Sequence, residues 1–371
     1  MLAYWFLYAL PAIPAFVGVR RPNMFSLPWI AVGLLFILAI GFREQVGGDW
    51  DSYLIRYDSL IEAPVDQVLA SDPGYRLLNR LYYNLIEAPT DVLFESDPGY
   101  RWLNRLMGIW DWQIYGVNTV CGAIFILGLF AYCRQLPAPW LGFAVAVPYL
   151  IIVMAMGYTR QSVALGFFLL ALADIERGHF LRYILWVALG TTFHKSAVLL
   201  VPLGIFTTQR KSWFWRVIAV ATAAYGLWDL FLEEHQEDLW KLYYVDQKME
   251  SQGARIRVLM NLVPSLLLLL YAKRWKQLFP AYQVWFWLSI AALISVVFVD
   301  FATTAVDRVS LYFTPLQVAV FARLPVLLGD RFPPPFLRLG VVMGYAAVLF
   351  VWLNYATHAE YWLPYRNILL Q

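Results

Sequence analysis

Long apolar runs separated by short polar stretches follow one another along almost the whole chain. A helix that crosses the hydrocarbon core of a bilayer needs about 20 predominantly apolar residues. This pattern predicts an all-α, polytopic integral membrane protein in which residues 1–371 form one membrane domain. Runs that cross or nearly cross a bilayer occupy 2–19, 27–42, 114–133, 138–157, 161–176, 181–206, 213–231, 258–272, 281–300, 308–328 and 338–355.

The run at 181–206 is too long for one crossing and is interrupted by His194, Lys195 and Pro202. We therefore expect two short helices that enter and return, with a break near His194. With this broken pair included, the sequence predicts about 11–12 membrane helices. Arg160 and Gln161 stand at the head of the preceding run, so strongly polar groups lie at both ends of this part of the chain.

The distribution of Lys and Arg gives the topology, because short cytoplasmic loops are enriched in them. One set of connections holds 14 basic and 3 acidic residues, net +11, and the remaining residues are net −8. We assign the first set to the cytoplasm and both chain ends to the opposite face. Without the break near His194 this alternation fails. The basic set is Arg20, Arg21, Arg134, Arg177, Arg182, Arg210, Lys211, Arg216, Lys273, Arg274, Lys276, Arg323, Arg331 and Arg338.

Composition supports this class and excludes others. The chain is 61% hydrophobic and only 14% charged, against about 25% charged residues in soluble domains. A net charge of +3 is too small to indicate a nucleic-acid partner. Residues 1–19 carry no charge, which favours a first transmembrane helix over a cleaved signal. Cys121 and Cys133 are about 18 Å apart on one expected helix, beyond disulfide reach. No Cys/His spacing suggests a metal, and we expect no metal and no cofactor.

Two outer loops are long and are expected to carry amphipathic helices. The loop at 43–113 contains a tandem repeat with a period of 25 residues, at 60–81 and 85–106. Each copy places Asp before Pro at a helix start, Asp72–Pro73 and Asp97–Pro98, which is favourable first-turn chemistry. Two copies indicate a local structural duplication. The second loop, 232–257, is acidic and aromatic, and is either a lid or a solvated linker.

Several strongly polar groups lie near helix ends on the outer face. Arginine offers a permanently charged fork that matches phosphate oxygens, and helix N-termini favour anions. We therefore expect a diphosphate site; the alternative for each single arginine is anchoring at the interface. The candidate diphosphate-binding residues are Arg43, Arg160, Gln161, Arg308 and Arg366.

Two residues are candidate catalytic bases. His194 lies at the break beside Lys195, whose charge would keep the imidazole neutral; the alternative is a hydrogen-bonded structural histidine. Asp49 lies in a GGD turn before Tyr53 and Tyr57, where a carboxylate could accept the proton of a sugar hydroxyl; the alternative is a turn residue.

These segments resemble the EpsG family, the Wzy-type polymerases of bacterial exopolysaccharide and O-antigen synthesis. The resemblance rests on motifs from about residue 43 to residue 366, and a second copy of the Asp-Pro-Gly-Tyr element departs from the family pattern. The motifs are FREQVGGDWDSYLIRY, DPGYRLLN and DPGYRWLN, YTRQSVALGFFLLA, FHKSA, DRVSLYF and YWLPYR.

The resemblance implies a metal-independent glycosyltransferase in the bacterial inner membrane with its active site facing the periplasm. It would transfer a growing glycan from undecaprenyl diphosphate to the non-reducing end of another lipid-linked repeat unit. Arg160 and Arg308 would bind the diphosphate, Gln161 would assist, and His194 or Asp49 would orient or deprotonate the acceptor hydroxyl. The implied partners are the undecaprenyl-diphosphate-linked oligosaccharide, membrane lipid, and a chain-length regulator and flippase of the same pathway.

Two alternatives stay open. An O-antigen ligase uses the same donor and also needs outer-face arginines. A flippase or transporter of lipid-linked sugars would show repeats of whole helical bundles and charged sites near the bilayer midplane. The repeat here is short and lies in a loop, and the charged groups gather at one face, which favours the polymerase.

Overall fold

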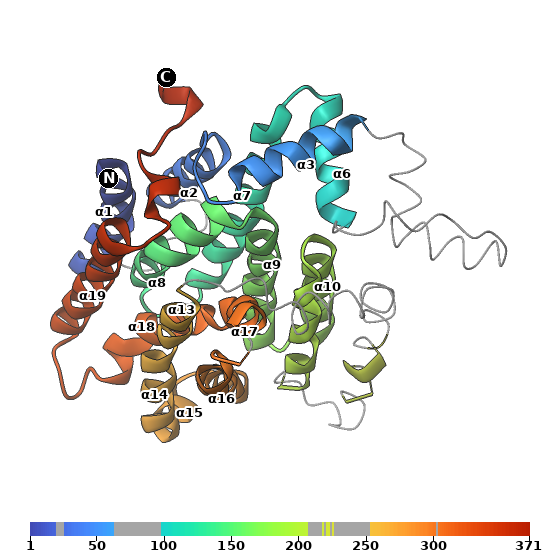
Figure 1. The fold of residues 1–371 in the computed structure, drawn as a ribbon. Helices are drawn as coiled ribbons and strands as arrows, with labels where there is room; N and C mark the ends of the chain where they lie inside the picture. Colours follow the sequence, from blue (N-terminus) through green and yellow to red (C-terminus); the bar gives the residue numbers. More distant parts are fainter. Residues whose placement is uncertain are drawn as a thin grey trace.

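The computed structural model describes residues 1–19, 26–62, 98–206, 217, 218, 220–222, 225, 253–301 and 303–371 (Figure 1). In these residues the secondary structure is helical, apart from one β-bridge between Arg43 and Asn367. The predicted all-α class is confirmed. The helices are α1 (Leu2–Val17), α2 (Leu27–Gly41), α3 (Trp50–Glu62), α6 (Pro98–Ile109), α7 (Gln113–Cys133), α8 (Pro139–Ala146), the π-helix η2 (Val147–Ala155), α9 (Thr159–Glu176), α10 (Phe180–Phe193), the 3₁₀ helix η3 (Lys195–Phe206), α13 (Ala254–Leu259), α14 (Leu262–Leu270), α15 (Ala272–Leu278), α16 (Tyr282–Phe298), α17 (Thr303–Ser310), η6 (Leu311–Phe313), α18 (Pro315–Leu327), α19 (Pro334–Tyr355), η7 (Ala359–Trp362) and η8 (Ile368–Leu370).

Three helices of the described part are long and apolar enough to cross a membrane: Gln113–Cys133, Val306–Leu327 and Pro334–Tyr355. Ala254–Leu270 and Ala272–Leu278, bent by 79° at the break between them, make a fourth if taken as one span. Six shorter apolar helices of 10–17 residues accompany them. The chain is thus a multi-pass membrane protein by composition. Among the described residues, fewer helices have full spanning length than the 11–12 or so expected for the whole chain, and most of the run at 213–231 lies outside them. Several apolar runs are bent or interrupted within their length.

The break near His194 is confirmed. Helix α10 ends at Phe193, His194 is extended, and η3 begins at Lys195. The two helices pack antiparallel, because the Tyr183 hydroxyl donates a hydrogen bond to the Leu200 carbonyl. The chain therefore reverses direction at His194, as the polar interruption of the apolar run predicted.

The run at 138–157 forms the centre of the protein. Every residue from 139 to 157 is buried, and α8 packs against α1, α7, α18 and α19. A helix that is hydrophobic on all sides is either buried among other helices or faces lipid, and α8 is of the first kind. In Figure 1, α8 accordingly lies inside the bundle and α19 at its edge.

The outer helices expose large apolar side chains instead. Exposed residues of this kind lie along α1, α14, α16 and α19. A monomeric soluble protein rarely exposes so much contiguous apolar surface, so this surface fits contact with lipid. Examples are Phe6, Ile13, Phe16, Val263, Leu270, Ile294, Val297, Phe336, Met343 and Phe350.

The long loops are only partly described. Helix α6 begins at Pro98, where the second repeat copy predicted a helix start. All but the first residues of the copy at 60–81 and all but the last residues of the loop at 232–257 lie outside the described residues. The two terminal segments are in contact, because the Tyr4 hydroxyl donates to the Trp362 carbonyl at 2.7 Å. The assignment of both chain ends to the outer face stays a prediction.

Helices α7 and α9 approach closely at two glycines. A Cβ at Gly128 would lie 2.1 Å from the Gly166 carbonyl oxygen, and a Cβ at Gly166 would lie 2.7 Å from the Phe125 Cα. These are backbone atoms, so neither contact can be relieved by turning a side chain. The absence of a side chain at both positions therefore sets the separation of the two helices.

Replacing Gly128 by Val should force α7 and α9 apart and destabilise the fold by about 1–3 kcal/mol, as overpacking does elsewhere. The unfolding midpoint of the purified protein in detergent measures this. Gly340→Ala is the control, since a Cβ at Gly340 meets no atom within 4 Å, and it should unfold like the wild type. Equal midpoints for Gly128→Val and wild type would contradict the close contact.

Candidate functional site

Arg43 follows α2 and is fully buried, with 1% of its surface exposed. Its Nε donates to the Val46 carbonyl at 3.2 Å, and one terminal nitrogen donates to the Ile40 carbonyl. The other terminal nitrogen donates to Asn118 Oδ1 at 3.3 Å and to Thr159 Oγ1 at 3.0 Å. The guanidinium thus joins the end of α2, the following loop, α7 and the first residue of α9.

This arrangement assigns Arg43 a structural position. Four of the five N–H donors of a guanidinium are used within the protein, and the group lies 5.8 Å from the Trp50 ring centroid. Burial lowers the pKa of Arg43 to about 10, so it stays protonated at neutral pH. We therefore leave Arg43 out of the diphosphate-binding set that the sequence suggested, because its donors are already engaged.

The segment between Arg43 and Asp49 is pressed against the start of α9. Gly47 adopts a positive φ of 109°, and a Cβ there would lie 2.2 Å from the Met156 carbonyl oxygen. A Cβ on Gly157 would lie 2.5 Å from the Trp362 ring. This close packing holds Asp49, at the start of α3, near the N-terminus of α9.

Arg160 is the second residue of α9, as predicted, and lies beside two tyrosines from the first outer loop. Burial raises the pKa of Tyr53, and the positive charge of Arg160 and a hydrogen bond with it oppose that shift, while Asp49 adds to it. Arg160 also acts on the buried Tyr100, whose ring centroid lies 5.8 Å from that of Tyr53. Tyr100 belongs to the second copy of the repeat, so this copy lies at Arg160.

Gln161 connects α9 to the segment that carries Arg308. Its Nε2 donates to the Arg308 carbonyl at 2.8 Å, and Gln161 itself is only 2% exposed. Arg308 lies in the last turn of α17, which begins at Thr303. It is also the third residue of the span Val306–Leu327, so it lies near the start of that membrane-length helix, as expected. The positive end of a helix dipole therefore favours an anion near both arginines.

His194 lies in the turn between α10 and η3, outside both helices. Its Nδ1 lies 2.6 Å from the Ser196 hydroxyl, which lies 3.1 Å from the Tyr312 hydroxyl. Burial, then the positive charges of Arg308 and Arg160, lower the pKa of His194 to about 3. The imidazole is thus neutral, as predicted, but the cause is burial and these two arginines rather than Lys195.

The sequence patterns did not single out Arg257, the third arginine of the site beside Arg160 and Arg308. Arg257 forms a bidentate ion pair with Asp307, both contacts at 2.6 Å, and the two side chains are 15% and 10% exposed. Arg257 was overlooked because it lies at the end of the acidic 232–257 loop. The signal that could have found it is its position immediately before the apolar run at 258–272, the same placement that singled out Arg160.

Several of these charged groups affect one residue, Tyr158. Burial raises its pKa, and the charges acting on it are, in decreasing order, Arg257, Asp307, Asp49 and Arg308. Together with the effects of Arg160 and Arg308 on His194, this places all of the named groups in one electrostatic neighbourhood. Three arginines and two aspartates meet there with a neutral histidine, so positive charge is in excess and the site suits an anion.

Arg366 has a different position. It is exposed on the C-terminal tail and donates to Gln45 Oε1. Its carbonyl accepts from the Glu44 amide at 3.1 Å, so the tail is paired with the segment after α2. No contact that the structure gives for Arg366 joins it to Arg160 or Arg308.

The EpsG family model matches residues 82–367, which is most of the chain. The chain belongs to the EpsG family. No curated protein matches it, and no solved structure does. The match spans Arg160, Gln161, His194 and Arg308, and it includes the second repeat copy, whose Tyr100 lies at Arg160.

Metal ligands do not gather in this EpsG family member within the part that the structure describes: no three His, Cys, Asp or Glu side chains group so that they could hold an ion. The positive groups in the site are arginines, which bind anionic oxygens directly. The charge of the described site therefore suits an anionic ligand.

Arg43→Met should destabilise the protein by about 3 kcal/mol or more, because it leaves buried carbonyl and hydroxyl acceptors without a donor. Membrane yield and the unfolding midpoint in detergent measure the loss. The control is Arg366→Met on the exposed tail, expected to change stability by less than about 0.5 kcal/mol. Similar losses of stability for both variants would contradict the structural role of Arg43.

The low pKa of His194 predicts a pH effect on stability. An unfolded histidine takes up a proton below about pH 6.5, whereas folded His194 does so only near pH 3. Stability should therefore fall as pH decreases below 6.5, by at most about 1.4 kcal/mol per pH unit. Unfolding midpoints at pH 7.5 and 5.5 should differ less in His194→Gln than in wild type. His358→Gln, at an exposed position, should behave as wild type.

Proposed function

We propose that this EpsG family protein is a Wzy-like polysaccharide polymerase. It transfers a growing glycan from undecaprenyl diphosphate to the non-reducing end of another lipid-linked repeat unit. The observation that carries the proposal is that Arg160 and Arg308 come together from separate parts of the chain. Gln161, next to Arg160, donates a hydrogen bond to the Arg308 carbonyl at 2.8 Å, and the charges of both arginines lower the pKa of His194. A pair of cations at this place can stabilise a leaving diphosphate.

The chemistry divides between two kinds of group. The acceptor hydroxyl oxygen attacks the anomeric carbon of the donor, and the bond from that carbon to the diphosphate oxygen breaks. Arg160 and Arg308 stabilise the negative charge that develops on the leaving diphosphate. The hydroxyl proton passes to His194 or Asp49, whichever lies within hydrogen-bond reach of that proton and has the more suitable pKa.

Gln161 has a positioning part in this scheme. Its amide is engaged with the Arg308 backbone, so it holds the two arginine-bearing segments together instead of binding the diphosphate directly. Arg257 is held by Asp307 beside the same site. A diphosphate would compete with the Asp307 carboxylate for that guanidinium, which makes Arg257 a further candidate ligand.

The charge distribution supports an orientation in the bacterial inner membrane with this site on the periplasmic face. Glu176 and Arg323, both counted in the basic set of connections, form a buried ion pair and cancel each other. The net charge of the basic set of connections therefore remains +11 when Glu176 and Arg323 are left out. Partners in this scheme are the undecaprenyl-diphosphate-linked oligosaccharide, the surrounding lipid, and a flippase and chain-length regulator of the pathway.

Arg160→Ala and Arg308→Ala should each abolish long-chain glycan, because the leaving diphosphate loses about 3 kcal/mol or more of charge stabilisation. Single lipid-linked repeat units should then accumulate at normal protein level. Gel analysis of glycan from a strain that carries only the variant measures both products.

Arg255→Ala is the matched control, because Arg255 pairs with Asp300 at an exposed position outside the site. It should make polymer of normal length. Full-length polymer from either site variant would remove the diphosphate role. If a site variant makes polymer of normal length but does not transfer it to a lipid A core acceptor, the protein is a ligase. If single lipid-linked repeat units stay on the cytoplasmic face in a site variant, the protein is a flippase.

A further inference from the structure

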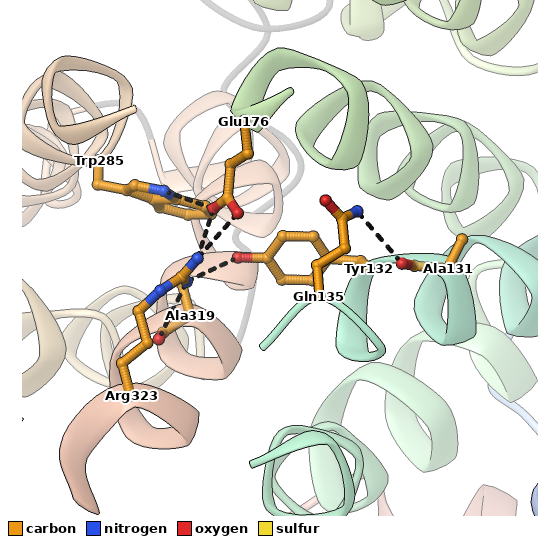
Figure 2. A network of polar contacts seen from close by, with 7 residues as sticks. All are labelled: Ala131, Tyr132, Gln135, Glu176, Trp285, Ala319 and Arg323. Carbon is orange, nitrogen blue, oxygen red and sulfur yellow. Dashed lines mark hydrogen bonds and ion pairs between the residues drawn. The ribbon is translucent and has the colours of Figure 1, made fainter. Parts of the chain in front are cut away.

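A buried ion pair lies at the other end of α9, far from the site. One terminal nitrogen of Arg323 lies 2.7 Å and 2.9 Å from the two carboxylate oxygens of Glu176. Trp285 Nε1 donates to the same carboxylate at 2.9 Å, and Tyr132 lies within hydrogen-bond distance of Arg323 at 3.3 Å. Figure 2 shows these side chains converging from four different helices.

The pair is shielded from water. The Glu176 and Arg323 side chains are 4% and 2% exposed. The Arg323 guanidinium also lies 5.3 to 5.7 Å from the ring centroids of Trp275, Phe279 and Trp285. Well-packed apolar residues would give similar stability without the cost of burying two charges. A buried pair of this kind instead demands one geometry, so its contribution is to fix how the helices fit together.

The two helices that carry this pair also carry the site arginines. Glu176 is the last residue of α9, whose second residue is Arg160, and Arg323 follows Arg308 on the span Val306–Leu327. At the site end the same helices are joined by the hydrogen bond from Gln161 to the Arg308 carbonyl. The two segments are therefore parallel and connected at both ends.

The spacing of the two connections matches. Gln161 and Glu176 are 15 positions apart, and Arg308 and Arg323 are also 15 positions apart. At 1.5 Å per helical residue each interval is about 22 Å. Between them the rings of Phe168 and Tyr312 pack edge to face, with centroids 6.2 Å apart. Sliding one helix by one residue would break the ion pair and the hydrogen bond together.

We propose that Glu176 and Arg323 are positioning residues that fix the register of α9 against α17 and α18 and thereby the spacing of Arg160 and Arg308. This rests on the proposed function, because the spacing matters only if both arginines hold one diphosphate. A displacement of about 1 Å at a reacting group can cost on the order of 100-fold in rate. A diphosphate held by two arginines therefore requires a fixed register, whereas a monophosphate held by one does not.

The test is the double variant Glu176→Gln with Arg323→Met. Gln keeps an acceptor for Trp285, Met fills space among the aromatic rings, and no unpaired charge remains buried. Binding of undecaprenyl diphosphate and of undecaprenyl phosphate to the purified protein in nanodiscs is measured for each variant. We expect affinity for the diphosphate to fall about tenfold, and affinity for the monophosphate to change by less than about threefold.

The control is Arg274→Met with Asp330→Asn, which removes an exposed ion pair of the same chemistry and should leave both affinities unchanged. The proposal is overturned if the double variant Glu176→Gln with Arg323→Met binds undecaprenyl diphosphate as tightly as wild type does. It is also overturned if this variant loses affinity equally for undecaprenyl diphosphate and undecaprenyl phosphate, which would indicate general destabilisation. The variant Arg308→Ala distinguishes a failure of the proposed function from a failure of the positioning role alone. If wild type and Arg308→Ala bind the diphosphate equally, the proposed function fails, and the positioning role with it. If only the positioning role is wrong, Arg308→Ala still loses binding.

Discussion

The candidate site depends on the buried guanidinium of Arg43. A charged group in a low-dielectric interior must have its donors satisfied, and Arg43 reaches that state only where α2, α7 and the first residue of α9 meet. Its contact with the Val46 carbonyl also holds the loop that leads to Asp49. One residue thus brings the start of α9, with Arg160, next to the loop that carries a candidate base.

The same physical requirement recurs along α9, where Gln161 and Glu176 each have a partner on another helix. Gln161 holds the segment of Arg308, and Glu176 holds Arg323. In water such contacts would contribute little, but in the interior each one specifies a unique arrangement of helices. The site arginines lie at the ends of segments whose positions are fixed in this way, which is how a membrane bundle can present cations at a defined spacing.

Much of this could be predicted from the sequence. The 61% hydrophobic composition, the apolar runs and the charge asymmetry predicted an all-α membrane protein, and the family match confirmed the resemblance drawn from its motifs. The interruption at His194 predicted a real reversal of the chain, because charged and polar residues are costly inside an apolar membrane helix. Pro202, in contrast, lies inside η3 and does not end it. Helix continuity was less predictable: apolar content does not reveal where a run bends, as at the 79° break before Ala272.

The sequence by itself determined which residues are costly to keep among apolar helices. It singled out as candidates Arg43, Asp49, Arg160, Gln161, His194, Arg308 and Arg366. Only the tertiary structure decided what each does. It showed that the donors of Arg43 are engaged in internal hydrogen bonds and that Arg366 lies on an exposed tail. It also showed that Arg257 joins the site through its ion pair with Asp307. The reason is that residue type fixes a side chain's charge and donors, whereas its partners depend on segments distant in the sequence, which local patterns do not encode.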